Sequence, residues 1–126
     1  MAKIEKFEDL DCWNAARQLV KLVYDVGETG KLSKDFETRS QIKRAALSSM
    51  NNIAEGFSRY SRKEFIWYLN ISQSSASEVK SMLYVMEDLN YETKDKPQNI
   101  HDQIDKTRNL ILAFIKYLNK PKAKFE

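Results

Sequence analysis

The sequence predicts an all-α protein, an antiparallel up-and-down four-helix bundle, from three observations. Chain breakers are scarce, with three Gly and two Pro in 126 residues, which favours long helices joined by short corners. Apolar residues recur in steps of four and three, the spacing of one face of an α-helix. The length suits one domain, residues 1–126, with a single core. The helices are expected at about residues 8–26, 34–57, 61–90 and 97–119.

The first helix, residues 8–26, has two neighbouring apolar stripes. One consists of Trp13, Ala16, Val20 and Val23, and the other of Ala15, Leu19, Leu22 and Val26. Asp9 and Asp11 are placed in its first turn, where the helix dipole favours carboxylates. Gly27 and Gly30 are expected to end it. Cys12 has no basic neighbour to lower its pKa and is expected to be a small buried hydrophobe.

The second helix, residues 34–57, is expected to be central, because apolar and small residues cover more than half of its circumference. Ser33 or Asp35 is the expected N-cap. Gly56 is predicted to end the helix in the left-handed conformation. The remaining polar stripe consists of Arg44, Ser48, Asn51 and Glu55. Because one four-helix core cannot bury so wide an apolar face, the sequence predicts assembly into a cyclic homo-oligomer.

The third helix is predicted to begin at a capping box, Ser61-Arg62-Lys63-Glu64, in which the Ser61 hydroxyl accepts from the Glu64 N–H. Tyr60 and Phe65 stand where a hydrophobic staple is expected. The apolar stripe that follows is Phe65, Leu69, Ser72, Ala76, Val79, Leu83, Met86 and Asn90. The Ser-rich middle, residues 72–78, indicates that another helix approaches closely there, either in the same chain or in another subunit.

The fourth helix follows a polar corner at residues 91–96, and Pro97 fits its first turn. Its stripe again has steps of four and three: Ile100, Ile104, Thr107, Ile111, Phe114 and Leu118. The basic tail after Pro121, like the charged residues 1–6, is expected to be frayed.

No catalytic centre, metal site or cofactor site can be assembled from these residues. His101 is the only histidine, which excludes a di-metal bundle with two Glu-x-x-His pairs and also bis-histidine haem ligation. We expect His101 to be a solvated surface residue. Glu55 is expected to hydrogen-bond near the corner or pair with Arg59, since no base or nucleophile accompanies it as a catalytic acid. The sequence therefore predicts that the protein is not an enzyme.

Basic residues cluster more than the net charge of +3 suggests. The candidate nucleic-acid-binding residues are Lys43, Arg44, Arg59, Arg62 and Lys63, and further lysines end the chain at Lys116, Lys120, Lys122 and Lys124. Aromatic neighbours at the corner, Tyr60, Trp67 and Tyr68, could stack on bases. The alternative is that these charges solvate helix faces and the aromatic rings pack. A monomer of this small charge favours that alternative, whereas an oligomer would repeat the patch as a ring.

The run from Gln41 to Phe65 resembles the hallmark of the small four-helix-bundle proteins whose genes lie in intervening sequences of bacterial 23S ribosomal RNA. The matching positions are Gln41, Arg44, Ala45, Ser48, Asn52, Ile53, Ala54, Glu55, Gly56, Arg59, Ser61 and Phe65. Phe7-Glu8-Asp9-Leu10 with Trp13, and Ser75-Ala76 with Glu78, are also similar to the family. Met50-Asn51 and Gln73-Ser74 depart from it. Asn52, Glu55, Gly56 and Ser61 are thus read as family-signature residues.

The resemblance implies a homopentamer shaped like a tapered barrel. It also implies kinship with the accessory subunit of diversity-generating retroelements, a pentamer that binds nucleic acid and a reverse transcriptase. Two hypotheses follow: an oligomer that binds RNA or DNA, with RNA favoured, or a structural scaffold that binds a partner protein. With one Cys, no signal peptide and no long apolar run, we expect a cytoplasmic protein without a membrane partner.

Overall fold

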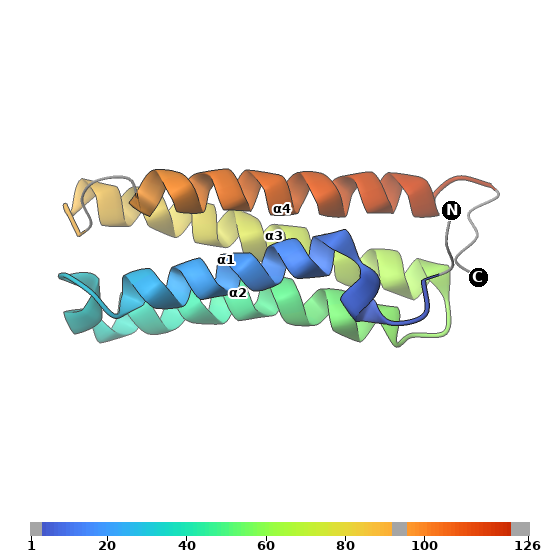
Figure 1. Ribbon diagram of the computed structural model, residues 1–126, viewed down its shortest axis with the longest axis horizontal. Coiled ribbons are helices and arrows are strands. Elements are labelled where there is room, and N and C mark those ends of the chain that lie inside the picture. Colours follow the sequence, from blue (N-terminus) through green and yellow to red (C-terminus); the bar gives the residue numbers. More distant parts are fainter. Residues whose placement is uncertain (1–3, 92–95, 122–126) are drawn as a thin grey trace.

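The computed structural model describes residues 4–91 and 96–121, and within them it contains four α-helices and two short 3-10 helices (Figure 1). In chain order these are η1 (Phe7–Asp9), α1 (Asp11–Gly27), η2 (Leu32–Lys34), α2 (Phe36–Phe57), α3 (Arg62–Asp88) and α4 (Lys96–Leu118). Each α-helix packs against the one before it, and α4 closes the bundle against α1. The predicted four-helix bundle is confirmed. Parts of the expected frayed ends and of the polar corner fall on residues 1–3, 92–95 and 122–126, outside the described residues, as do Lys122 and Lys124.

Helix α1 begins later than predicted, at Asp11. The residues before it form η1, and Leu10 between the two helices is extended, with φ −82° and ψ 125°. The Asn14 side chain bridges this break by donating to the carbonyl oxygens of Glu8 (2.9 Å) and Leu10 (3.0 Å). The break folds Phe7 back onto Trp13, with ring centroids 5.0 Å apart.

Asp35 is the N-cap of α2, so of the two expected caps the second is correct. Its Oδ1 accepts from the Thr38 N–H at 3.2 Å. Ser33 lies in η2 instead and donates to the carbonyl of Gly30, which has the positive φ of 60° that the turn requires. The Tyr91 hydroxyl donates to Asp35 Oδ2 at 2.9 Å, which joins the end of α3 to the start of α2.

The prediction that Gly56 adopts a left-handed conformation is wrong. Helix α2 continues through Gly56 to Phe57, and φ of Gly56 is not positive. A Cβ at this position would lie 2.7 Å from the Tyr68 Cβ and 2.8 Å from the Phe65 Cδ1. The absence of a side chain at Gly56 therefore allows α3 to approach α2.

The Ser61 cap of α3 is confirmed, with the Glu64 N–H donating to Ser61 Oγ at 3.0 Å. The expected staple is wrong, because Tyr60 is fully exposed. Phe65 packs edge-to-face against Phe57 (6.0 Å between centroids) and Phe114 (5.5 Å), and these two rings take the place predicted for Tyr60.

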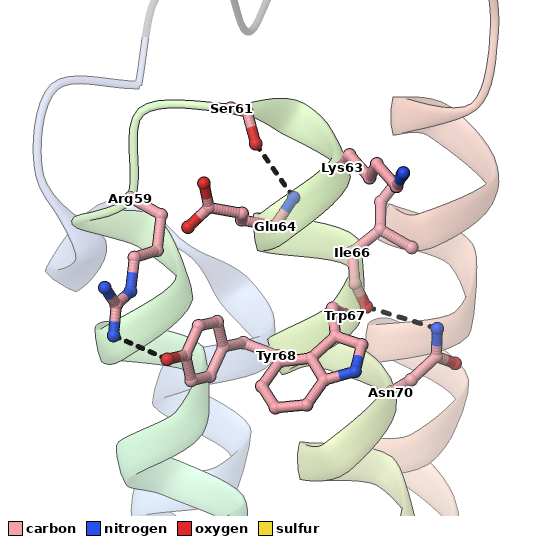
Figure 2. A pocket seen from close by; sticks show the side chains of 8 residues that line it. All are labelled: Arg59, Ser61, Lys63, Glu64, Ile66, Trp67, Tyr68 and Asn70. Atoms are coloured by element: carbon pink, nitrogen blue, oxygen red, sulfur yellow. Dashed lines mark hydrogen bonds between the residues drawn. The ribbon is translucent and has the colours of Figure 1, made fainter.

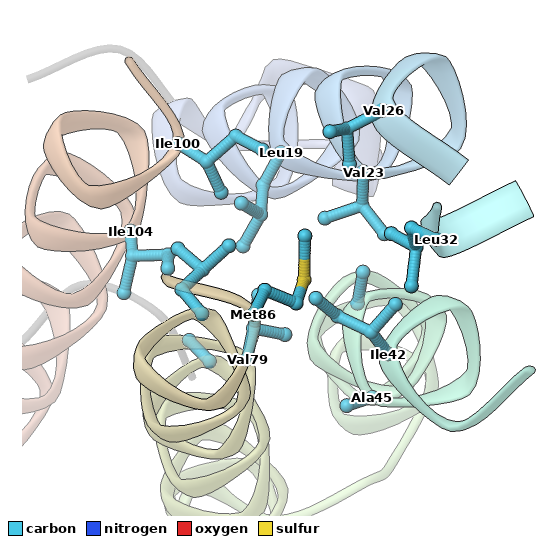
Figure 3. Close-up of a cluster of buried hydrophobic side chains, with 13 residues drawn as sticks. Leu19, Val23, Val26, Leu32, Ile42, Ala45, Val79, Met86, Ile100 and Ile104 are labelled. Atoms are coloured by element: carbon cyan, nitrogen blue, oxygen red, sulfur yellow. The ribbon is translucent and has the colours of Figure 1, made fainter. Parts of the chain in front are cut away.

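The core consists of two clusters of buried side chains at opposite ends of the bundle. At the end where α2 begins, the side chains are aliphatic and come from all four helices (Figure 3). At the end where α2 meets α3, Phe65 is buried with Leu69 and Ile111, and several aromatic rings pack around them. The predicted α3 stripe is buried from Phe65 to Met86, whereas Asn90 lies beyond the helix with a φ of 55°. In the α4 stripe Phe114 is half-buried and the other residues are buried.

In the Ser-rich part of α3, Ser72 and Ser75 face α2 of the same chain. Ser72 Oγ donates to the Ser49 carbonyl at 2.5 Å, and both residues are buried. Ser48 Oγ and Ser75 Oγ are 2.8 Å apart. Small hydroxyl residues on both helices thus allow close packing while their polar atoms find partners.

Candidate nucleic-acid interface

The five predicted nucleic-acid-binding residues fall into two groups. Lys43 and Arg44 lie in the first half of α2, whereas Arg59, Arg62 and Lys63 surround the connection of residues 58–61, here called the α2–α3 corner. The 15 residues from Arg44 to Arg59 correspond to about 22 Å along a helix. A single chain therefore does not bring these five cations into one patch.

Lys43 has a local role between α1 and α2. Its Nζ is 3.2 Å from Glu28 Oε1 and lies 4.6 Å from the centroid of the Tyr24 ring. Arg44 is exposed and forms no ion pair with any residue that the structure describes. Of these two cations, Arg44 is the one available to a ligand.

Arg59 is held between the two helices of the corner. Its Nη2 donates to Glu55 Oε1 at 2.6 Å and to the Tyr68 hydroxyl at 2.5 Å, and its guanidinium carbon lies 4.9 Å from the centroid of the Tyr68 ring. The predicted Glu55–Arg59 pair is confirmed. A guanidinium has five N–H donors, and Nε and Nη1 make no hydrogen bond within the described chain. Arg59 therefore keeps donors for an anionic ligand in a fixed position.

Arg62 and Lys63 differ in their surroundings. Arg62 Nη1 donates to the Lys120 carbonyl at 3.2 Å, which ties the start of α3 to the end of α4. Lys63 is exposed and has no ion-pair partner among residues 4–91 and 96–121. Lys63 is therefore the corner cation most accessible to a ligand.

An open hollow of about 620 Å³ lies beside these cations (Figure 2). The residues that line it are Arg59, Ser61, Lys63, Glu64, Ile66, Trp67, Tyr68 and Asn70. The Trp67 side chain is large and the residue is 60% exposed. It makes a T-shaped contact with Tyr68, with ring centroids 4.9 Å apart. The hollow thus combines cations with an aromatic surface that a planar ligand can reach.

Figure 2 shows two sides to this hollow. Lys63, Trp67 and Asn70 lie along α3 on one side, whereas Arg59 and Tyr68 lie on the other, toward which the Glu64 carboxylate projects. The Asn70 amide is oriented by donation to the Ile66 carbonyl at 3.2 Å. Sequence reasoning did not include Asn70, although its distance of seven residues from Lys63 places both on one helical face.

His101 is buried, not solvated as predicted, with 7% of its surface exposed. Its Nε2 is 3.2 Å from Glu87 Oε1 and its Nδ1 is 3.4 Å from Lys80 Nζ. Lys80 also binds Asp105 at 3.0 Å, and the Tyr84 ring lies 5.0 Å from the imidazole. Lys80 and Glu87, both on α3, cover the two ring nitrogens, which is why a polar residue can be buried here.

The described residues place no group of three or more His, Cys, Asp or Glu side chains so that they could hold a metal ion. Cys12 is buried, as predicted. Burial raises the pKa of its thiol to about 12, so this sulfur is not a thiolate nucleophile at neutral pH. Within the described residues, no helix combines the length and apolar character required to span a membrane.

Comparison with known proteins assigns the family. The model of the 23S rRNA-intervening sequence protein family matches residues 8–113, which include the α2–α3 corner and all five candidate cations. The chain belongs to this family. A search of curated proteins finds no match. A crystal structure of a protein of unknown function from the S23 ribosomal protein family of Bacteroides thetaiotaomicron is similar, with 25% identity and a TM-score of 0.75. The match covers 83% of this chain and 95% of that one.

In this member of the family, the four signature residues lie at or near the junction of α2 and α3. Asn52 donates to the carbonyl (2.8 Å) and hydroxyl (3.0 Å) of Ser48. Glu55 pairs with Arg59, Gly56 admits the side chains of α3, and Ser61 caps that helix. Their contacts are internal to the protein, and of the four only Ser61 lines the hollow.

Proposed function

We propose that this chain is a non-enzymatic protein that assembles into a cyclic homo-oligomer and binds nucleic acid, with RNA favoured, at the α2–α3 corner. One observation carries the proposal: the exposed Trp67 indole lies one helical turn after the exposed Lys63, in a hollow that Arg59 also lines. Cations that contact phosphates and aromatic rings that stack on bases are the two elements of nucleic-acid binding without sequence preference.

The charge of one chain is small, so the proposal includes self-association. A cyclic pentamer would carry five times the +3 charge of one chain and would repeat Lys63 and Arg59 around the ring. Such repetition strengthens long-range attraction of a polyanion. Exposed apolar side chains lie on α3 and just after it, toward the end of the bundle opposite the corner, at Tyr84, Val85 and Leu89. We propose that they form the subunit contacts. The wide apolar face of α2, from which we predicted the oligomer, is largely covered within the chain itself.

The salt dependence of RNA binding tests this function. Phosphate contacts release counterions, so log affinity should fall linearly with log salt concentration. Lys63→Gln should weaken binding to every RNA or DNA tested by a similar factor. It should also flatten the salt slope by roughly one unit for each phosphate that the Lys63 side chains of the assembly no longer neutralise. Lys21→Gln, the same charge change on an exposed residue of α1, is the matched control and should have little effect.

A scaffold for a partner protein is the second candidate. Two observations favour it: Arg59 and Arg62 are engaged in contacts within the chain, and the outer side of α3 carries exposed apolar residues. A scaffold predicts little affinity for nucleic acid at physiological salt and no difference between Lys63→Gln and Lys21→Gln. That pattern would contradict nucleic-acid binding and support protein interaction.

A further inference from the structure

We propose that the hollow beside Trp67 binds single-stranded nucleic acid, with one unpaired base stacked on the Trp67 indole and the adjacent phosphate on Lys63. The inference rests on the proposed function and deepens it, because it names the form of the ligand and the residue that selects it.

Trp67 stands between two hollows on the outer side of α3. The first is the hollow of about 620 Å³ described above. The second, of about 310 Å³, is lined by Trp67, Asn70, Ile71, Ser74, Ser75 and Glu78. Because Trp67 is 60% exposed and open space adjoins it on two sides, a flat ring can approach the indole without displacing any helix.

The indole has one aromatic contact within the described chain. Its T-shaped contact is with the Tyr68 ring, which is fixed in turn by the hydrogen bond from Arg59 to the Tyr68 hydroxyl. A base that stacks on Trp67 would therefore meet a ring that already packs on a neighbour, which lowers the entropic cost of binding. Tyr60 is fully exposed, with no ring contact in the part of the chain that is described, and Tyr68 is half-buried beneath Arg59. Of the three aromatic candidates, Trp67 is thus the best prepared to stack.

The charges around Trp67 indicate where the phosphate lies. Lys63 precedes Trp67 by four residues, a separation that places side chains next to each other on a helix. The Glu64 carboxylate lies on the Arg59 side of the hollow in Figure 2, and Glu78 lines the opposite end of the second hollow. Lys63 therefore attracts a phosphate at one end, and Glu78 repels a phosphate at the other end. The strand should cross α3 close to the corner.

Stacking on Trp67 requires an accessible base face. In a duplex both faces of an internal base are covered by neighbouring base pairs, whereas bases in single strands can be splayed out onto aromatic side chains. Every base has such a face, so this contact selects strandedness more than sequence.

Fluorescence anisotropy on the full chain in its native assembly separates stacking from charge. Three labelled probes of equal length are needed: a mixed-sequence single-stranded RNA, its duplex, and an abasic strand with the same phosphates. The single strand should bind most tightly. Trp67→Ala should lower that affinity about 10- to 100-fold and leave the abasic affinity unchanged, while Trp67→Phe should retain most of it. Phe36→Ala, at an exposed aromatic residue at the other end of α2, is the control and should change nothing.

Each contrary result has a distinct meaning. Equal affinity for the three probes, or an unchanged Trp67→Ala variant, would overturn this inference and leave charge-mediated binding in place. No binding to any probe would overturn the proposed function as well. Light scattering and circular dichroism on Trp67→Ala should show unchanged mass and helicity. A drop in assembly mass together with the disappearance of all binding would instead make Trp67 a subunit contact and refute the stacking role.

Discussion

Gly56 in α2 packs directly on Tyr68 in α3, so closely that a Cβ on the glycine would lie 2.7 Å from the Tyr68 Cβ. The backbone of Gly56 is helical and unstrained. The requirement for glycine at this position is therefore set by another helix. The contact also lies at the corner, because Tyr68 accepts a hydrogen bond from Arg59 and makes a ring contact with Trp67.

Gly56→Ala should destabilise the protein, by about 1–3 kcal/mol, because the new methyl group overlaps Tyr68 and Phe65. In an ordinary helix interior the same change stabilises the protein by roughly 1 kcal/mol. The sign of the stability change therefore shows whether Gly56 is needed for close packing against α3. The matched control is Gly27→Ala, where the new Cβ would meet the Lys43 Cε at 3.1 Å, part of a side chain that can move. Urea unfolding of the two variants measures the difference, and a gain in stability for Gly56→Ala would contradict the close packing.

Ser61→Ala should lower the free energy of unfolding by roughly 1 kcal/mol through removal of the α3 cap. The Glu64 N–H would then lack the acceptor that it has at 3.0 Å. Ser81→Ala, an exposed serine within α3, provides a comparison that should be close to neutral. Equal stabilities for the two variants in thermal unfolding would show that the cap does not stabilise the helix.

The Tyr91–Asp35 hydrogen bond should make stability depend on pH in both directions. Hydrogen bonds from the side chain and backbone of Thr38, and from Tyr91, lower the pKa of Asp35 from its ordinary value of 3.8. The hydrogen bond to Asp35, with a smaller effect of burial, raises the pKa of Tyr91 above 10.0. A lowered carboxyl pKa stabilises the fold above 3.8, and this effect disappears as pH falls through the folded value. A raised phenol pKa stabilises below 10.0, and this effect disappears as pH rises through the folded value.

Tyr91→Phe should therefore be less stable than the parent between about pH 4 and pH 10, and the difference should shrink on either side of that window. NMR titration should also show the Asp35 pKa moving up toward 3.8 in this variant. Tyr84→Phe removes an exposed hydroxyl that makes no hydrogen bond within the described residues. This variant should show neither the pH-dependent loss of stability nor the change in the Asp35 pKa. A pH-independent difference for Tyr91→Phe would contradict the assigned hydrogen bond.

Most of the fold could be predicted from local patterns in the sequence. The steps of four and three from Phe65 to Met86 predicted the buried face of α3, because they follow directly from the helical repeat. Ser61 and Asp35 were recognisable as caps for a similarly local reason. The start of α1 could not be predicted in this way. The three-residue spacing of Phe7 and Leu10 is compatible with both a 3-10 turn and an α-helix.

The errors lie where a distant residue determines the local structure. Gly56 near a helix end suggests a left-handed cap, and only Tyr68, twelve residues later, shows that the constraint is steric. His101 is buried because Lys80 and Glu87 on another helix satisfy its ring nitrogens. At the candidate site, the four-residue separation of Lys63 and Trp67 is enough to predict that they share one face of α3. The hydrogen bond from Arg62 to the Lys120 carbonyl could not be predicted from local sequence, because the two residues are 58 positions apart.

The mass of the assembly with and without mixed RNA tests the central claim most directly. Light scattering at micromolar concentration should return several times the 14.8 kDa mass of one chain, with five chains expected. The mass should increase when single-stranded RNA is added at low salt and return to that of the protein alone at high salt, because phosphate contacts weaken as salt rises. A particle of 14.8 kDa that does not change with RNA at any salt concentration would contradict both the oligomer and its binding of nucleic acid.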